Sequence, residues 1–464
     1  MTILVRRKWW GSWLAACLGI SGCGLLWNDP IGKNAPFVSL TEPATDGASP
    51  DLDLSSADNS NISDPVASSE GPLLGDGETP SSPETFLQQL AAYCDEEVPL
   101  PGSDGSPEAV VRQYGDEVVL AWFRPDDTST IQVSWYEGAF AAPRDTFTLH
   151  LPEGESASLF GLHMRPFDDG VIVVSGSTNI PGESQDAFAW SLARDGTERV
   201  PATRLHGLGR FATDVAITAS GALLVVRSFE SPGDTGKLWV GDARTLAADV
   251  THDLVSSGSD GITTEARIVP RGSTALITWR QNVSSGLGSD KTLNFARYDI
   301  ASKTLYDADD AGPSGSPWLP AYRPFFIEGP GDTIWAAWHS GLGGERDLWM
   351  TVFDANMHRP AEPMRISSTE SIPHGGHDIR WLRDGDAMML YFAGRRGIET
   401  GTDTDETGTH LVQLESDGSL VGEVRRISDL AHRKDPVLAG EGIHYTILTD
   451  ESEGGPLRLA VNCH

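Results

Sequence analysis

The chain has 464 residues, with 34 Lys and Arg against 66 Asp and Glu, so its formal net charge at pH 7 is −32. A surface of this sign repels the phosphate backbone, which argues against a protein that binds nucleic acid. The 50 Gly and 29 Pro residues favour many short strands joined by turns, and 39% hydrophobic residues suffice for a large core. We therefore expect an all-β protein.

The N-terminus has the pattern of a bacterial export signal. A basic triplet, Arg6-Arg7-Lys8, precedes an apolar stretch over residues 9–22. The tetrad Ile20-Ser21-Gly22-Cys23 resembles the lipobox of bacterial lipoproteins, which implies a signal peptide over 1–22, an acylated Cys23 and attachment to the outer membrane through the acyl chains. A second tetrad, Leu14-Ala15-Ala16-Cys17, also fits the lipobox, and an uncleaved anchor helix over 9–27 is a third interpretation.

Residues 23–82 are expected to form a disordered tether. This segment mixes Ser, Asp, Pro, Gly and Ala without a sustained apolar period, so it cannot bury enough apolar area to offset its ordering entropy. Ser82-Pro83-Glu84 then has the form of a helix start, and apolar residues follow at helical spacing. We expect one short helix over 83–93.

From residue 94 to residue 464 one unit recurs, built around a glycine turn. Each unit has an apolar strand, the turn, a strongly apolar second strand and a third strand whose aromatic residues we expect to pack between units. The turns lie 51 to 59 residues apart and centre on Gly115, Gly170, Gly221, Gly272, Gly331, Gly385 and Gly442. This period is typical of propeller blades. We predict a seven-bladed β-propeller of four-stranded antiparallel blades.

The last unit ends after its third strand, so its outer edge needs a cover. Glu97-Val98-Pro99-Leu100 aligns with the fourth strand of the preceding unit, Arg425-Arg426-Ile427, and can supply the missing strand from the N-terminal side. Cys94 precedes this segment and Cys463 ends its expected neighbour. We therefore expect a disulfide between the two cysteines in the oxidising envelope, with two free thiols as the alternative.

The repeats resemble a known family. Asp435-Pro436-Val437-Leu438-Ala439, then Gly442 and an apolar strand, is similar to the repeats of bacterial sialidase-like propeller lipoproteins. The resemblance covers residues 95–464 and implies the architecture of a BNR-type propeller. True sialidases carry Asp-box turns between the third and fourth strands. No such box is complete in the corresponding turns here, which are Ala193-Arg-Asp-Gly196, Asp299-Ile-Ala-Ser302, Asp354-Ala-Asn356 and Ser416-Asp-Gly418.

Three arginines from different units are candidate ligands for an anion. Arg210, Arg323 and Arg433 each lie just before a first strand, where propeller loops face the central channel. His377 is a fourth candidate for this face. The alternative is that the arginines pair with nearby aspartates of this acidic chain. A sialidase would add a tyrosine nucleophile and an acid–base aspartate, and neither can be assigned from the sequence.

Two segments have partial metal-binding patterns. His374-Gly-Gly-His377-Asp378 offers two imidazoles and a carboxylate, but its spacing is flexible and no distant third ligand is evident. Asp403-Thr404-Asp405-Glu406-Thr407 matches the first half of a calcium loop, whose twelfth position falls on Leu414 in place of glutamate. We predict no metal or other cofactor, with Ca²⁺ at residues 403–407 as the alternative.

The sequence thus predicts an envelope lipoprotein with no assigned catalytic residue. Its propeller is expected to act as a non-catalytic binding or scaffolding module for a protein or glycan ligand, because loops from all blades can vary around one entrance without changing the core. The alternative is a glycan-active hydrolase or lyase of the sialidase-like superfold.

Overall fold

The computed structural model describes most strands between residues 96 and 463. The described ranges are 96–99, 109–114, 117–124, 127–137, 143–157, 161–178, 186–206, 208, 212–227, 236–254, 262–282, 291–306, 321–340, 347–354, 363–367, 379–384, 386–394, 408–428, 431–432, 437–440, 443–449 and 457–463. All belong to one compact unit, Ser81–His464. The predicted signal peptide, Cys23, the tether and the helix over 83–93 lie outside these residues.

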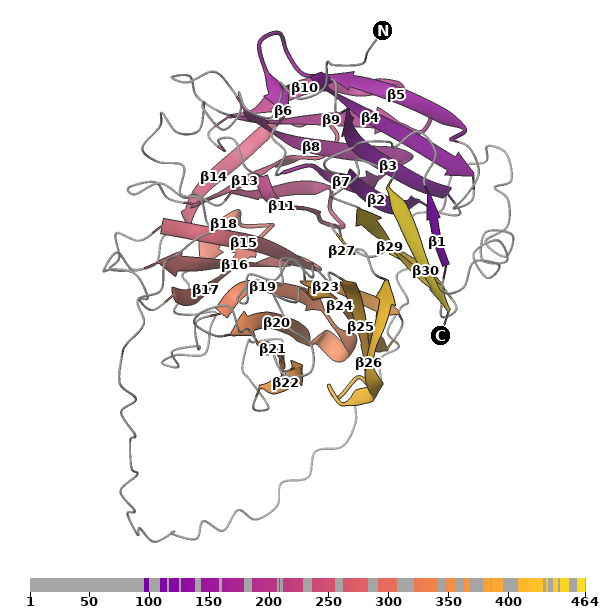
Figure 1. Cartoon of the computed structure of the whole chain (residues 1–464). Coiled ribbons are helices and arrows are strands. Elements are labelled where there is room, and N and C mark those ends of the chain that lie inside the picture. Colours follow the sequence, from indigo (N-terminus) through magenta and orange to yellow (C-terminus); the bar gives the residue numbers. More distant parts are fainter. Residues whose placement is uncertain are drawn as a thin grey trace, which may run out of the picture. The chain divides into compact units, whose positions relative to one another are not determined.

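Within the described ranges the strands form seven antiparallel sheets (Figure 1). Five sheets have four strands each, which follow one another in chain order. The first sheet consists of β2 (Ala109–Tyr114), β3 (Glu117–Arg124), β4 (Asp127–Glu137) and β5 (Asp145–His150), and the second of β11 (Ala212–Ile217), β12 (Ala222–Arg227), β13 (Gly236–Asp242) and β14 (Ala248–Leu254). The third consists of β15 (Ile262–Arg271), β16 (Thr274–Asn282), β17 (Lys291–Asp299) and β18 (Thr304–Tyr306), the fourth of β19 (Ala321–Glu328), β20 (Ile334–Ser340), β21 (Asp347–Phe353) and β22 (Met364–Ser367), and the fifth of β23 (Ile379–Asp384), β24 (Ala387–Gly394), β25 (Gly408–Leu414) and β26 (Leu420–Ser428). A 3₁₀ turn, η1 (Pro330–Asp332), joins β19 to β20.

The other two sheets have five strands each. One consists of β6 (Ser156–Ala157), β7 (His163–Phe167), β8 (Gly170–Thr178), β9 (Ala187–Ala193) and β10 (Glu198–Leu205). The other, which we call the closing sheet, consists of β1 (Glu96–Pro99), β27 (Ala431–His432), β28 (Val437–Gly440), β29 (Ile443–Thr449) and β30 (Arg458–Cys463).

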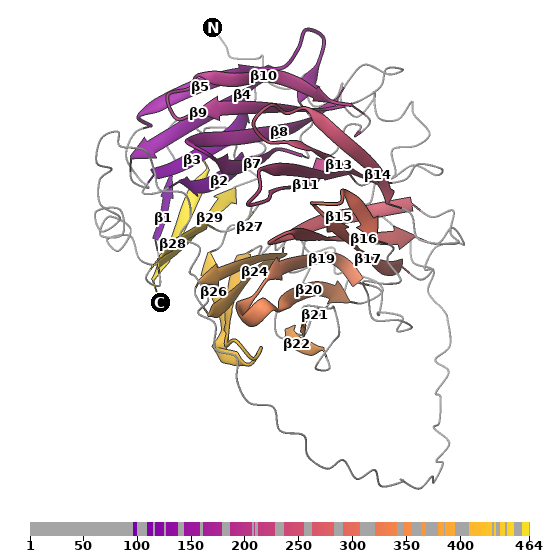
Figure 2. The same ribbon diagram turned by 180° about the vertical axis from the view of Figure 1, so that it is seen from behind.

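The first strands of the sheets contact one another in sequence. β2 contacts β7, β7 contacts β11, and the series continues through β15, β19, β23 and β28 back to β2. We call these seven strands the inner strands. Figures 1 and 2 show the sheets following one another in this order.

The prediction of an all-β propeller with four-stranded antiparallel blades is confirmed. Because gaps separate many described strands, the count of seven blades in one ring stays a prediction.

The N-terminal strand completes the closing sheet, as predicted. β1 pairs antiparallel with β30, with Glu96 opposite Val461 and Pro99 opposite Arg458. The hydroxyl of Ser428, at the end of β26, donates a hydrogen bond to the carboxylate of Glu97. The added strand is therefore bonded both to its own sheet and to the preceding one.

The second and third strands are buried because sheets cover them on both faces. In β3, Val118, Val119, Leu120 and Ala121 are fully buried. The hydrophobic clusters join residues of adjacent sheets, for example Trp135 of β4 with residues of β8 and β9. The aromatic residues of the third strands therefore pack between sheets, as expected from the sequence.

One glycine has a different role from the expected turn position. Gly170 is the first residue of β8, and the turn before it is formed by Asp168, at φ +49°, and Asp169. A Cβ atom on Gly170 would lie 1.9 Å from the carbonyl oxygen of Leu192. This glycine is required by the close approach of β9, whereas Gly221 and Gly272 do have positive φ angles in their turns.

Aspartates stabilise the turns between third and fourth strands, although these turns lack complete Asp-boxes. Asp195, Asp299 and Asp417 each accept a hydrogen bond of 2.7–2.9 Å from a backbone N–H two or three residues later. These backbone bonds, and at Asp417 first of all the bond from the Ser419 side chain, lower the pKa of each carboxyl below its ordinary value of 3.8.

These aspartates predict a loss of stability in acid. A carboxyl whose pKa is lower in the folded state stabilises the protein above pH 3.8, and this contribution is lost as the pH falls through the folded-state pKa. The triple variant Asp195→Asn/Asp299→Asn/Asp417→Asn should unfold at lower urea concentration than the wild type at pH 7, and the difference should vanish near pH 2. Urea midpoints across this pH range test the prediction, and a difference independent of pH would contradict it.

Candidate functional site

Arginines recur along the inner strands. Arg112 lies on β2, Arg165 on β7, Arg267 on β15 and Arg380 on β23, and all four side chains are half-buried. We call these residues the inner-strand arginines. They come from four different sheets of a chain whose net charge is −32. Their concentration on strands that contact one another makes this region a candidate anion-binding site.

The four guanidinium groups share one backbone contact. In each case Nη1 donates a hydrogen bond to the carbonyl oxygen of the preceding residue: 2.7 Å for Arg112, 3.1 Å for Arg165, 3.0 Å for Arg267 and 2.8 Å for Arg380. Nη1 of Arg267 also donates to the carbonyl oxygen of Thr213 on the neighbouring inner strand, at 2.9 Å. These bonds fix the orientation of each guanidinium group before any ligand arrives.

Two of these guanidinium groups pack on one aromatic ring. Phe325 lies on β19, which contacts β15 on one side and β23 on the other. The Cζ atoms of Arg267 and Arg380 lie 4.4 Å and 4.1 Å from the centroid of its ring. At these distances each cation interacts favourably with the ring, and the two positive charges are held close together around Phe325.

The inner strand β11, between β7 and β15, carries the carboxylate of Asp214. Asp214 accepts hydrogen bonds from Nη2 of Arg165 at 3.2 Å, from the Val215 N–H at 2.8 Å and from the Ile268 N–H at 2.9 Å. Asp214 therefore links β7, β11 and β15. Arg165 belongs to this structural link, whereas Arg267 and Arg380 lie together at the ring of Phe325, so we take this pair as the candidate contact for a ligand.

A histidine completes the candidate site. His163, on β7, Arg267 and Arg380 each lie four residues before the last paired residue of their strand. Nε2 of His163 lies 3.1 Å from the carbonyl oxygen of Ala212, which can only accept a hydrogen bond. Nε2 is therefore the donor, and in the neutral imidazole Nδ1 is the acceptor.

Two glutamates elsewhere are buried and paired with arginines. Glu117 pairs with Arg144 and, at 2.7 Å, with Arg194 of the next sheet. Glu155 pairs with Arg204 at 2.9 Å. The Glu117–Arg194 pair joins the β2–β5 sheet to the β6–β10 sheet, whereas Glu155 directly precedes β6 and pairs with Arg204 of β10 in the same sheet. We assign these contacts to the packing of the propeller.

The residues singled out in the sequence are placed only in part. Arg323 lies in β19, two residues before Phe325, but its side chain is outside the description. Arg210, Arg433, His377 and the calcium-loop residues Asp403, Asp405 and Thr407 lie outside the described residues, as does Cys94. Cys463 ends β30, and only its backbone is described. These site assignments therefore stay predictions.

Within the described ranges, no group of three or more His, Cys, Asp and Glu side chains is arranged to hold a metal ion. In the same ranges, no helix is long and apolar enough to cross a membrane.

Sequence reasoning missed the inner-strand arginines, although a signal was present. Arg267 and Arg380 each lie five residues before the turn glycine expected in their unit, Gly272 and Gly385. Arginines at matching positions within two first strands are therefore a signal that the sequence carries.

Comparisons with known proteins identify the fold. No protein-family model matches the chain, and no curated protein matches its sequence. A solved structure of a polysaccharide lyase of family PL25, an ulvan lyase, matches with a TM-score of 0.52 and 10% identity, over 80% of this chain and 95% of that one. An ulvan lyase bound to a -[GlcA(1-4)Rha3S]- glycan matches with a TM-score of 0.51, at the same identity and coverage. At this identity the likeness shows the β-propeller fold.

Proposed function

We propose that this protein acts on an acidic polysaccharide, which it binds through the inner-strand arginines. The observation that carries the proposal is the pair of guanidinium groups of Arg267 and Arg380 over the ring of Phe325. Guanidinium groups match the planar geometry of carboxylates, and the ring of Phe325 holds these two groups close together. The acidic groups of a polysaccharide are suitable ligands for such a pair.

The fold neighbours support a glycan-active protein over a non-catalytic module. The two solved structures reported above are described as ulvan lyases, and one of them holds a glycan with glucuronic acid units. The glycan-active alternative drawn from the sequence is therefore our preferred function.

Lyase chemistry suits a uronate bound beside arginines. A base removes the proton from the carbon next to the carboxylate, the electron pair forms a carbon–carbon double bond, and the glycosidic oxygen leaves with a proton from an acid. The negative charge that develops on the carboxylate is stabilised by nearby guanidinium groups. His163 is our candidate for the base, because Nδ1 is its acceptor and Arg165 follows on the same strand.

Three readouts on the purified protein distinguish the possible activities. The substrates are polyglucuronate, polygalacturonate, alginate and a sulfated glycan, with dextran as the neutral control. An ultraviolet-absorbing unsaturated uronate would support the lyase, and new reducing ends without that absorbance would support hydrolysis. Retention of the protein in gels containing acidic glycans, without any product, would support the non-catalytic module. Failure to bind any of the acidic glycans would contradict the proposal.

We also propose that acyl chains on Cys23 hold the protein at the outer membrane. The lipobox-like tetrad that ends at Cys23 supports this location. A polysaccharide-degrading protein anchored in this way would meet its polymer at the cell envelope.

A further inference from the structure

Three successive inner strands each contain a β-bulge, at which the inner strand has one residue more than the strand it pairs with. The residues that resume the pairing directly after the bulges of β11, β15 and β19 are Asp214, Arg267 and Phe325. Bulges redirect side chains and are common beside active sites. The bulges therefore occur where the candidate site residues leave their strands.

The bulge of β11, which we define as Ala212–Asp214, binds two of the candidate site residues through its carbonyl groups. The Thr213 oxygen accepts a hydrogen bond from Nη1 of Arg267 at 2.9 Å, and the Ala212 oxygen accepts one from Nε2 of His163 at 3.1 Å. The donors come from β15 and β7, the two inner strands that contact β11. A Cβ atom on Gly161 would lie 3.1 Å from the same Ala212 oxygen, so the chain leading into β7 also fits closely against this bulge.

The side chain of Asp214 fastens the β11 bulge to both neighbouring strands. Its Oδ1 accepts hydrogen bonds from Nη2 of Arg165 at 3.2 Å and from the Val215 N–H at 2.8 Å. Its Oδ2 accepts a bond of 2.9 Å from the N–H of Ile268, the residue after Arg267. The side chain is only 16% exposed, so these bonds are largely shielded from water. The carboxylate thus holds a side chain of β7 and the backbone of β15 next to Arg267.

We propose that Asp214 is a positioning residue, which fixes His163 and Arg267 relative to each other through the β11 bulge. The inference rests on the proposed function, in which Arg267 binds an acidic group of the polysaccharide and His163 is the candidate base. A base that removes the proton beside a carboxylate must be held in a fixed geometry to the group that binds the carboxylate. One bulge bonded to both side chains meets this requirement before the polymer arrives.

The expected effect of removing the Asp214 carboxylate is opposite in sign to a simple charge effect. If Asp214 acted through its charge alone, Asp214→Asn would strengthen the binding of an acidic glycan, because one repulsive charge is removed. If Asp214 positions Arg267, the same variant weakens binding. An amide has one oxygen in place of two, and its nitrogen can only donate, so it cannot accept all three bonds in the same geometry.

Calorimetry with polyglucuronate, polygalacturonate, alginate and a sulfated glycan tests the sign on the purified protein. Asp214→Asn should weaken the affinity by about tenfold. Asp214→Glu retains the charge but is longer by one methylene group, so it should also bind more weakly than the wild type, and it provides the same test if Asp214→Asn does not fold.

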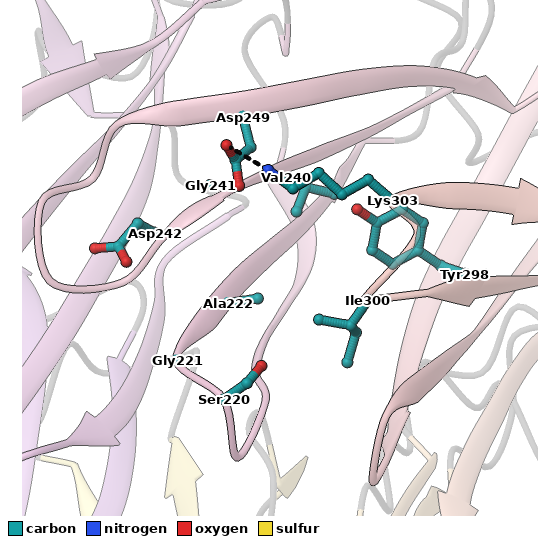
Figure 3. A pocket seen from close by; sticks show the side chains of 10 residues that line it. All are labelled: Ser220, Gly221, Ala222, Val240, Gly241, Asp242, Asp249, Tyr298, Ile300 and Lys303. Atoms are coloured by element: carbon teal, nitrogen blue, oxygen red, sulfur yellow. Dashed lines mark ion pairs between the residues drawn. The ribbon is translucent and has the colours of Figure 1, made fainter.

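Asp249→Asn is the matched control for the change of charge. Asp249 lies on β14 of the same sheet and also pairs with a cation of the next sheet, since its Oδ1 lies 2.9 Å from Nζ of Lys303 (Figure 3). It contacts neither His163 nor Arg267 in the described hydrogen bonds and ion pairs. This variant should bind the acidic glycans like the wild type.

A second readout does not depend on glycan binding. The ¹⁵N NMR signal of Nε2 reports the bond from His163 to the Ala212 oxygen, and His163→Gln identifies this signal among those of the 12 histidines. Asp214→Asn should shift the signal, because the bulge that carries the acceptor is no longer fastened on both sides. Asp249→Asn should leave it unchanged.

The outcomes separate a positioning role from a structural or purely electrostatic one. Weaker binding in both Asp214 variants, with a shifted His163 signal in Asp214→Asn, would support the inference. Stronger or unchanged affinity in Asp214→Asn, wild-type affinity in Asp214→Glu or an unchanged His163 signal would each overturn it. If the wild type binds none of the acidic glycans, the proposed function fails, and the His163 signal alone decides whether Asp214 positions this residue.

Discussion

The double variant Arg267→Met/Arg380→Met should bind an acidic polysaccharide about 100-fold more weakly than the wild type, because each charge-assisted hydrogen bond contributes about 1.5 kcal/mol and 1.4 kcal/mol corresponds to a factor of ten. Methionine retains much of the apolar length of arginine but has no charge. Isothermal titration calorimetry with the acidic glycan that binds best measures the effect. The wild-type affinity should also fall as salt is raised, whereas the residual affinity of the variant should depend less on salt.

Two further variants identify the cause of the loss. Arg271→Met removes an arginine from the same strand, β15, but Arg271 lies near the turn and its Nη2 donates to the carbonyl oxygen of Asp332 at 2.7 Å. This variant should bind acidic glycans like the wild type. Arg267→Lys/Arg380→Lys keeps the charges without the planar donors, so it should recover part of the affinity. If Arg271→Met weakens binding as much as the double variant, the inner-strand arginines are not the site.

Much of the fold follows from local patterns in the sequence. Apolar runs such as Val118–Phe123 predict strands that are covered on both faces, and the structure buries this run in β3. The N-terminal strand was also predictable, since the last unit lacks a fourth strand and residues 97–100 align with one. Gly170 shows the limit of this reasoning. It was aligned as a turn residue, yet the structure requires it because β9 approaches its Cα closely.

The candidate site was harder to predict because its residues are far apart in the sequence. Arg267, Phe325 and Arg380 lie on three successive inner strands, and their contacts depend on how the sheets pack side by side. The sequence shows that each residue lies in a first strand, but it does not show which side chains meet across sheets.

Loss of a Cys94–Cys463 disulfide should lower the free energy of unfolding by about 2–5 kcal/mol. The register of β1 and β30 supports this proposed bond. Glu96 lies opposite Val461 and Val98 opposite Leu459. If the same register continued two residues before Glu96, Cys94 would be opposite Cys463. Directly opposite residues on antiparallel strands have Cα atoms about 4.5–5.5 Å apart, which is within the range of disulfides.

The bond would close the propeller, because it joins the N-terminal strand to the last strand of the same sheet. Without it, β1 can separate from β30 and leave an unpaired edge, while each of the other sheets retains its neighbours.

Cys94→Ser, Cys463→Ser and the double variant should all be destabilised equally in urea unfolding, because each lacks the same bond. Reducing agent should lower the wild type to the same level. Mass spectrometry of an unreduced digest should find the linked peptides. Two free thiols, or single-variant effects that add up in the double variant, would show that the ring is held by strand pairing alone.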